Sequence, residues 1–433
     1  MAEAARESRQ GTVPPAITVR GRALRAAKQF VAGTHRCVAP EQTWEFIRPR
    51  LRRAGITRVA DLTGLDHVGV TTATAIRPNG RSLSNSAGKG FTKIASFVSA
   101  AMEALELHHA EFPHLDYTVA TYDELNAGAP VHELERMAFS RCSLFRRDRP
   151  EAWVLGWDLL QERETWLPWV SVAMTYRPKP EPRMEMAMPM TSNGLASGNH
   201  LLEAVCAALY EVIERDAVAC QLNAEVTAGY RAPLVPLDAL GFPLVDELLA
   251  RFRAAGMRVV ARDCTTDTEV PVYTAYLFDE RARGFGGFAG WGAHLDPEIA
   301  LIRAITEAAQ ARVIYISGSR DDLFRLDERQ ARYEDNPGQV AKKTAPGLRD
   351  APRRRSEARS SFEDDLALLL RKLQRVGIRQ VLFVDLTKDD LAIPVVRVVV
   401  PGLEGYIGHS YVGGERARAA VARARRLIQE SAQ

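Results

Sequence analysis

The chain has 433 residues, of which 57 are Lys or Arg and 54 are Asp or Glu, so its formal net charge at pH 7 is +3. That length allows a large core and two or three domains, whereas so small a charge gives no argument for nucleic-acid binding. The five cysteines form no C-x-x-C pair, the first residues lack a secretion signal, and no apolar run approaches about 18 residues. These features favour reduced thiols in a cytoplasmic protein without a membrane segment.

The N-terminal region is predicted to begin with a disordered tail, residues 1–15. A helix is expected from about Pro40, with Trp44, Ile47 and Leu51 on its buried side. One or two strands with a tight turn near Asp66 follow it.

A loop of small residues, SLSNSAGKGFT, precedes a helix predicted over Thr92–His109. Gly88 and Gly90 in this loop would let its backbone approach a ligand closely. The loop is not a P-loop, because G-x-x-x-x-G-K requires glycine at position 83, where the chain has leucine. Lys89 is a candidate phosphate ligand, although a lysine in such a loop is more often simply exposed.

The middle of the chain is predicted to hold a hairpin with its turn at QERET, and its four tryptophans are expected to pack in the core. The second of three acidic helices, of which Thr92–His109 is the first, follows Gly198 and extends to about Cys220. A helix and two strands then lead to a third acidic helix, for which Asp296 is the N-cap and Pro297 the first residue. The cysteine of this second helix nearest its apolar side, Cys206, is expected to be structural.

The C-terminal region is predicted to be a long mobile loop, a helix, two strands and a basic tail helix. The alternation of elements favours one large α/β (α+β) domain over residues 16–433. Its expected parts are an N-terminal part at about 33–80, a core at about 81–330, the mobile loop at about 333–361 and a C-terminal α/β part at about 362–433.

Three of the predicted helices are copies of one pattern. Aligning SAAMEALE (Ser99–Glu106), AALYEVIE (Ala207–Glu214) and RAITEAAQ (Arg303–Gln310) superposes their alanines and their acids. Each copy has one apolar face and presents E-x-x-E or E-x-x-Q on the other. Three amphipathic helices that share a period by chance are the competing interpretation, and the agreement of glycines, alanines and acids together argues against it.

Acidic stripes with few neighbouring bases indicate a bound cation. Carboxylates that converge repel one another unless a cation joins them, and Mg²⁺ prefers oxygen ligands. Because phosphates commonly complete the coordination of Mg²⁺, a nucleoside triphosphate is the expected partner. The candidate phosphate ligands are Arg36, Lys89, Arg215 and Arg312, since guanidinium groups and lysines suit phosphate oxygens.

Five stretches of the chain resemble the YcaO superfamily, in family order and over most of the length. They are GTHR…T (Gly33–Thr43), GKGxTxxxAxxSAxxEAxE (Gly88–Glu106), SNGxAxGNxxxEAxxxAxxExIERDA (Ser192–Ala217), DPxxALxxAxxEAAQxR (Asp296–Arg312) and VVRVVVPGLE (Val395–Glu404). The resemblance implies a YcaO-type fold that binds ATP and Mg²⁺ between acidic helices. It also implies that ATP phosphorylates a backbone amide oxygen of a peptide and so activates that amide.

The same resemblance assigns roles to individual residues. The implied metal ligands are Glu103, Glu106, Glu211 and Glu214. The implied cofactor-binding residues are Arg36, Thr43, Lys89, Asn199, Glu203 and Arg215, with Glu203 at the ribose. The implied catalytic residues are Arg215, Gln310 and Arg312.

The nucleophile that attacks the activated amide distinguishes members of the superfamily. Azoline-forming members typically end in a proline-rich segment, whereas this chain has no proline after Pro401. It looks more like members that work with a TfuA-type partner and introduce sulfur into a precursor peptide, forming a thioamide. Azoline formation, amidine formation and a non-catalytic ATP-binding scaffold are the alternatives. A homodimer is left open, and no nucleic-acid or membrane partner is expected.

Overall fold

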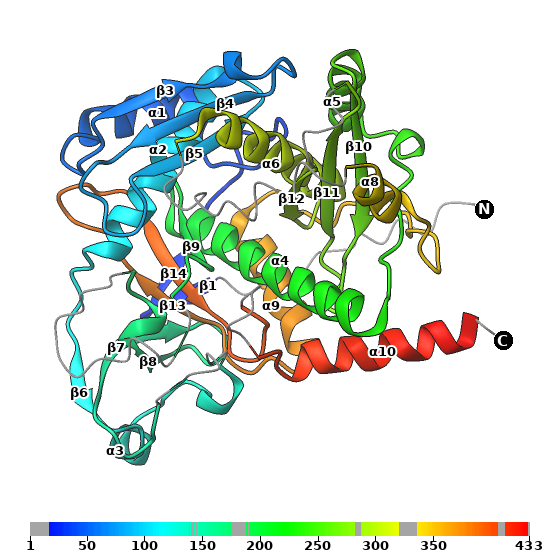
Figure 1. The fold of residues 1–433 in the computed structure, drawn as a ribbon. Helices are drawn as coiled ribbons and strands as arrows, with labels where there is room; N and C mark the ends of the chain where they lie inside the picture. The colour runs from blue at the N-terminus through cyan, green and yellow to red at the C-terminus, as the bar shows by residue number, and fades with distance from the viewer. Residues whose placement is uncertain are drawn as a thin grey trace, which may run out of the picture.

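The computed structural model describes residues 17–137, 139, 143, 145–174, 188, 190–281, 287–319, 336–405 and 412–431 (Figure 1). The predicted tail over residues 1–15 lies outside this part of the chain, as does Cys142. In the described part, helices pack around antiparallel sheets, which agrees with the predicted mixed class.

The strands form a small hairpin and three larger sheets. The hairpin pairs β1 (Ile17–Val19) with β2 (Arg22–Leu24). One sheet is ordered β3 (Arg58–Asp61), β4 (Thr71–Ile76), β5 (Asn85–Gly90), and another is ordered β10 (Met257–Asp263), β11 (Val272–Asp279), β12 (Phe288–Ala293). The largest is ordered β6 (Thr118–Ala120), β7 (Glu151–Asp158), β13 (Leu382–Asp385), β14 (Val395–Val399), β9 (Leu195–Ser197), with β8 (Arg163–Pro168) also paired to β7.

The helices surround these sheets (Figure 1). The three that carry the acidic pattern are α2 (Lys93–Glu111), α4 (Leu201–Ala228) and α6 (Pro297–Ser317). The others are α1 (Pro40–Ile47), α3 (Tyr122–Gly128), α5 (Pro243–Ala254), α8 (Asn336–Thr344), α9 (Phe362–Arg375) and α10 (Glu415–Ser431). No helix in the described residues is long and apolar enough to cross a membrane.

Each acidic helix follows a strand that packs directly against it: β5 before α2, β9 before α4 and β12 before α6. A glycine makes each approach possible. A Cβ atom at Gly88 would lie 2.1 Å from the amide nitrogen of Ala100, one at Gly198 2.7 Å from that of Ala204, and one at Gly292 2.1 Å from the carbonyl of Ala300. The internal repeat is therefore a strand followed by a helix, with the two backbones in contact.

This packing corrects the expectation of a ligand-binding loop before the first helix. Six residues of that stretch form β5, which pairs with β4 along its whole length. Small residues were the source of the error, because Ser, Gly and Ala are typical of loops. Here they are needed so that the strand can lie against α2, and Gly88 faces a helix rather than a ligand.

Helix α4 is the centre of the molecule. Leu202, Leu209 and Ile213 are fully buried in a cluster that includes side chains of α9 and β14. Burying each such side chain stabilises the fold by about 1.5–3 kcal/mol. The helix continues two turns beyond the predicted end, to Gly229, which adopts the left-handed conformation (φ 69°) that ends helices.

The predicted hairpin is confirmed with its turn two residues earlier than expected, and the predicted N-cap of α6 is confirmed. Strands β7 and β8 pair through a turn at residues 159–162, and Trp153 is completely buried. The Asp296 carboxylate accepts hydrogen bonds from the backbone amides of Glu298 and Ile299 at the start of α6. Cys206 is buried in the core, as expected of a structural thiol.

The predicted loop at 333–361 differs from the structure in its described part. Residues 336–344 form α8, and the rest is attached to the surrounding sheets and helices. The amide of Glu357 donates to the carbonyl of Leu295 at 3.0 Å, and Arg354 forms an ion pair with Asp263 at 2.9 Å. Its polar composition reflects these side-chain contacts with β10, which cannot be recognised from sequence.

Candidate active site

The acidic stripes of α2, α4 and α6 face one another. The charges of Glu103 and Glu211 both act on Glu106, and the charge of Glu307 acts on Glu214. Three repeats that are separate in sequence thus bring at least five carboxyl groups into one region. Figure 1 shows α2 and α6 above α4, which runs across the centre of the view.

Glu214 is buried, Glu106, Glu211 and Glu307 are half-buried and Glu103 is exposed, and this partial burial changes the acidity of the group. Burial is the main reason why the pKa of Glu106 is raised to about 8; the charges of Glu103 and Glu211 also raise it, and two hydrogen bonds from Ser197 oppose the rise. Those bonds come from the backbone amide (2.8 Å) and the hydroxyl (2.6 Å) of Ser197. Burial also raises the pKa of Glu214, followed in effect by the charge of Glu307.

Four cations border the carboxylates. Lys89 Nζ lies 2.7 Å from Glu307 Oε2, and Arg215 Nη2 lies 3.9 Å from Glu211 Oε1. The charges of Arg303 and Arg397 also act on Glu211. Arg397 is held in place on β14 by donating to the carbonyl oxygens of Ser171 (3.0 Å) and Thr191 (2.5 Å).

Several polar atoms of this region are buried without a hydrogen-bond partner among the described residues. They are Glu214 Oε2, Arg303 Nε and Arg397 Nη1. Buried polar groups are normally satisfied, so orphaned atoms of both charges in one place indicate that a ligand completes the site. Carboxylate oxygens suit Mg²⁺, and guanidinium groups suit phosphate, so the residues present fit a magnesium–nucleotide pair.

A second group of polar residues surrounds Glu203, two turns before Glu211 on α4 and so about 12 Å along the helix axis. Its carboxylate accepts hydrogen bonds from the amide of Cys37 at 2.8 Å and from Asn199 Nδ2 at 3.1 Å, and Arg36 Nε lies 3.6 Å away. Thr43 Oγ1 donates to Asn199 Oδ1 at 2.8 Å. The predicted cofactor-binding residues of the N-terminal region therefore meet at one end of the acidic stripe.

Arg36 connects the two groups. Burial lowers its pKa and the charge of Glu203 raises it, while the charges of Arg303 and Glu106 also reach it. It thus lies between the Glu203 group and the carboxylate group.

Two of the predicted catalytic residues, Arg312 and Gln310, lie on α6 in different surroundings. Arg312 is buried on another side of α6 and forms ion pairs with Asp66 at 3.0 Å and Asp279 at 2.9 Å. These contacts favour a structural role, and the catalytic role expected of it gains no support from them. Gln310 is half-buried on α6, one turn after Glu307.

Sequence reasoning did not assign roles to Arg303, Glu307 and Arg397. The repeat alignment already placed Glu307 on Glu103 and Glu211, which was a sufficient signal for a fifth carboxylate. Arg397 is a single arginine within an apolar strand, a pattern that indicates a cation facing a buried partner.

Comparison with known proteins identifies the family. A family model described as YcaO cyclodehydratase, ATP- and Mg²⁺-binding, matches residues 87–404. An uncharacterised protein encoded in the tfuA 3′ region of Rhizobium leguminosarum bv. trifolii is 36% identical over 401 residues, which are 90% of this chain and 93% of the relative.

Solved structures share the fold. YcaO from Methanopyrus kandleri bound with AMPPCP and Mg²⁺ has a TM-score of 0.68 at 24% identity, covering 90% of this chain and 100% of that chain. A heterocyclase in complex with substrate and cofactor has a TM-score of 0.73 at 24% identity. That similarity covers 88% of this chain and 54% of the heterocyclase, so the chain spans about half of its length. The chain belongs to the YcaO family, whose members bind ATP and Mg²⁺.

Proposed function

We propose that this protein uses ATP and Mg²⁺ to activate a backbone amide of a ribosomally made peptide, and that sulfur then replaces the amide oxygen to form a thioamide. The observation that carries the proposal is the convergence of carboxylates from three helices next to cations with unpartnered atoms. Because the chain belongs to a family described as ATP- and Mg²⁺-binding, ATP with Mg²⁺ is the proposed ligand of these residues.

In this proposal Glu103, Glu106, Glu211, Glu214 and Glu307 hold Mg²⁺. Arg36, Thr43, Lys89 and Arg215 contact the phosphates, and Asn199 and Glu203 bind the ribose end. The chain's own contribution is to hold these charges in fixed positions before the nucleotide arrives, so that little reorganisation is needed during phosphoryl transfer.

Thioamide formation is preferred because a relative covering nine-tenths of the chain is encoded next to tfuA. A TfuA-like protein is accordingly the proposed partner, with a precursor peptide as substrate. The cyclodehydratase description of the family favours azoline formation as the second candidate.

Two measurements test the proposal. Calorimetric titration of the protein with Mg²⁺–ATP should give binding, and Glu211→Gln should abolish it; binding that survives the substitution would contradict the site. Mass spectrometry of a precursor peptide treated with the protein, ATP, sulfide and the TfuA-like partner should then show exchange of one oxygen for sulfur. Loss of one water from the peptide would instead establish azoline formation.

A further inference from the structure

A strap of the N-terminal region, residues 26–39, runs from α9 across α4 to the active site. At its start, the amide of Ala26 donates to Glu363 Oε2 at 2.8 Å. At its end, Arg36 and the amide of Cys37 meet Glu203. The strap thus carries Arg36, the predicted phosphate ligand, and is attached to α9 at its other end.

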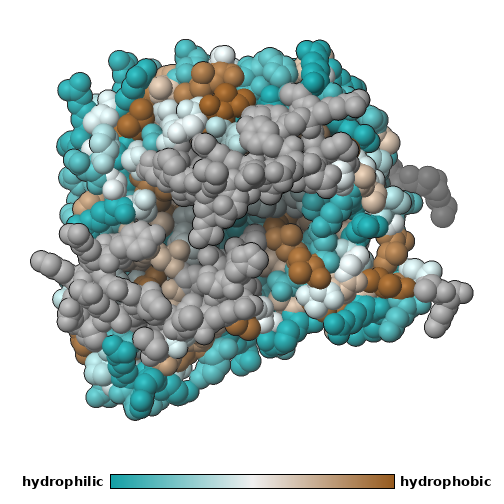
Figure 2. Space-filling view, viewed as in Figure 1, coloured by the Kyte–Doolittle hydropathy of each residue, from teal (hydrophilic) through white to brown (hydrophobic). Residues whose placement is uncertain are grey.

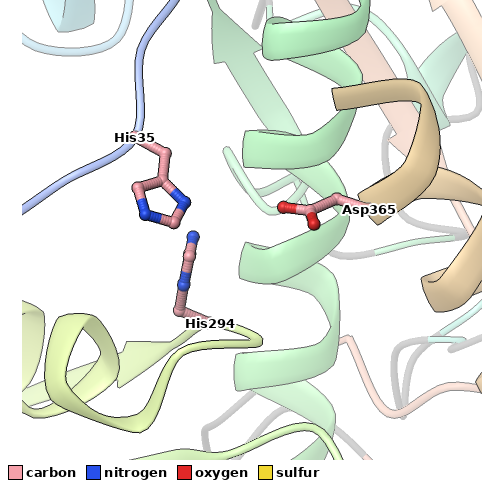
Figure 3. A group of neighbouring side chains, drawn as sticks. All are labelled: His35, His294 and Asp365. Carbon is pink, nitrogen blue, oxygen red and sulfur yellow. The ribbon is translucent and has the colours of Figure 1, made fainter. Parts of the chain in front are cut away.

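Between these ends lies a buried cluster of ionisable side chains. His35 from the strap, His294 from the loop before α6, and Asp365 from α9 place their ligand atoms within 4.8 Å of one another. Figure 3 shows the two imidazole rings next to each other, with the Asp365 carboxylate directed toward them from α9. A metal ion would fit such a group of ligands.

The position of the cation is already taken by Lys28. Its ammonium group lies 2.5 Å from Asp365 Oδ2 and 3.0 Å from His35 Nδ1, and both Lys28 and Asp365 are almost fully buried. Burial, together with the charge of Lys28, lowers the pKa of His35 to about 4, so this ring is neutral and accepts the hydrogen bond from Lys28.

The cluster is anchored on all sides. Tyr210 of α4 directs its hydroxyl to Asp365 Oδ2 at 3.3 Å, and the amide of Arg359 donates to Asp365 Oδ1 at 2.7 Å. His294 stacks against Tyr210 and contacts His35 edge-on. The lysine is therefore held by rigid neighbours, and through its bond to His35 it holds the strap.

We infer that Lys28 is a positioning residue for the nucleotide site: clamped by Asp365, it fixes His35 and thereby the neighbouring Arg36 over Glu203. His35 and Arg36 are adjacent in the chain, and Arg36 Nη1 also donates to the His35 carbonyl at 2.8 Å. Lys28 is itself part of the strap, so Lys28→Met would remove the side-chain contacts with Asp365 and His35. The backbone bonds of Lys28 to Ser360 and of Arg36 to Phe30 would remain. The inference rests on the proposed function in one respect, that Arg36 serves the nucleotide.

The test compares affinity for Mg²⁺–ATP with stability in Lys28→Met and in the double variant Lys28→Met/Asp365→Asn. Removing one partner leaves a buried carboxylate unpaired and destabilises the protein, whereas removing both charges relieves that penalty. If Lys28 is only structural, the double variant should regain both thermal stability and affinity for Mg²⁺–ATP. A positioning lysine predicts that it regains stability but keeps a Kd for Mg²⁺–ATP raised roughly tenfold or more, as for loss of outer-shell partners elsewhere. Lys93→Met is the matched control, because Lys93 is an exposed lysine paired with Asp61.

A readout without nucleotide keeps the inference separate from the proposed function. Cys37 is half-buried beside Arg36, and its amide is bonded to Glu203. Release of the strap in the folded double variant should speed alkylation of Cys37, measured by peptide mass spectrometry, while buried Cys206 stays unreactive. An unchanged alkylation rate with unchanged Kd would overturn the inference. Faster alkylation in a protein whose wild type fails to bind Mg²⁺–ATP would support the clamp and reject the proposed function.

Discussion

Lys89 on β5 forms an ion pair with Glu307 on α6, with 2.7 Å between Nζ and Oε2. The pair joins the first repeat to the third across the active site. The ammonium group neutralises one of several converging carboxylates and lowers the pKa of Glu307, although burial opposes this. Lys89 therefore acts partly as a counterion that holds the site together before a metal binds.

Lys89→Met is expected to destabilise the metal-free protein by roughly 0.5–1 kcal/mol, since both side chains are partly exposed and solvent screens the pair. Mg²⁺ supplies the missing positive charge, so the difference in melting temperature from wild type should shrink when Mg²⁺ is added without the nucleotide, whose phosphates Lys89 is proposed to contact. Thermal unfolding with and without Mg²⁺ measures this. An equal deficit in both conditions would show that Lys89 is not near the metal.

Glu214→Gln is expected to separate stability from binding. The wild-type carboxylate is buried among other acids and one oxygen has no partner, so its neutral isostere should stabilise the metal-free protein by about 1 kcal/mol. The same change removes a proposed Mg²⁺ ligand and should abolish stabilisation by Mg²⁺–ATP. Glu247→Gln on the exposed face of α5 is the control and should leave both properties nearly unchanged. A less stable metal-free Glu214→Gln variant would contradict the electrostatic account.

The acidity of Glu106 predicts a pH dependence. Its pKa is raised to about 8 in the folded protein, above the ordinary value of 4.5, because burial disfavours the charged form. The folded state thus retains a proton that the unfolded state has lost, and the free energy of unfolding of the metal-free protein should fall as pH rises from about 4.5 to 8. Metal binding must expel this proton, so affinity for Mg²⁺–ATP should rise over pH 6.5–8.5, a window of about one to two units around that pKa.

Calorimetry in buffers of different ionisation enthalpy measures the released proton directly. At pH 7 wild type should release nearly one proton from this group on binding Mg²⁺–ATP. The Glu106→Gln variant cannot release this proton. Any affinity for Mg²⁺–ATP that the variant keeps should therefore lack this part of the pH dependence. Binding with no net proton release in the wild type would show that Glu106 is ionised before the metal arrives.

Gly88→Ala tests the contact that places α2. The new Cβ atom would lie 2.1 Å from the Ala100 nitrogen and 2.3 Å from the Ser96 carbonyl, so strand and helix must move apart. A loss of about 2–3 kcal/mol in the free energy of unfolding is expected, as for overpacking of rigid cores. Gly128→Ala in α3, where a Cβ atom meets nothing within 4 Å, is the matched control and should be neutral or stabilising. Equal stability of the two variants would refute the close approach.

Sequence reasoning predicted the parts of the site that repeat. Helix period and capping placed α2, α4 and α6, and their alignment placed the acids on one face. The contacts that complete the site come from single residues far away in sequence. Ser197 bonded to Glu106, Arg397 beside Glu211 and Lys28 beneath His35 depend on how the sheets pack, and no local pattern encodes them.

The same limit explains where sequence and structure differ. The small residues of β5 predict a loop, because their close contact with α2 is tertiary. The family resemblance implies a catalytic role for Arg312, which stays a prediction, whereas its ion pairs with Asp66 and Asp279 join segments far apart in sequence.

The order of strands in the largest sheet has a consequence for synthesis of the protein. β9, which leads into α4 and carries Ser197, has β14 as its neighbour, and β14 follows it in the chain by almost half of the sequence. Arg397 lies on this late strand. When all three acidic helices have left the ribosome, β14, which pairs with the strand before α4, has therefore not yet been released. The complete nucleotide site therefore requires translation to pass β14, and until then the carboxylates of the nascent chain lack the positive charge of Arg397.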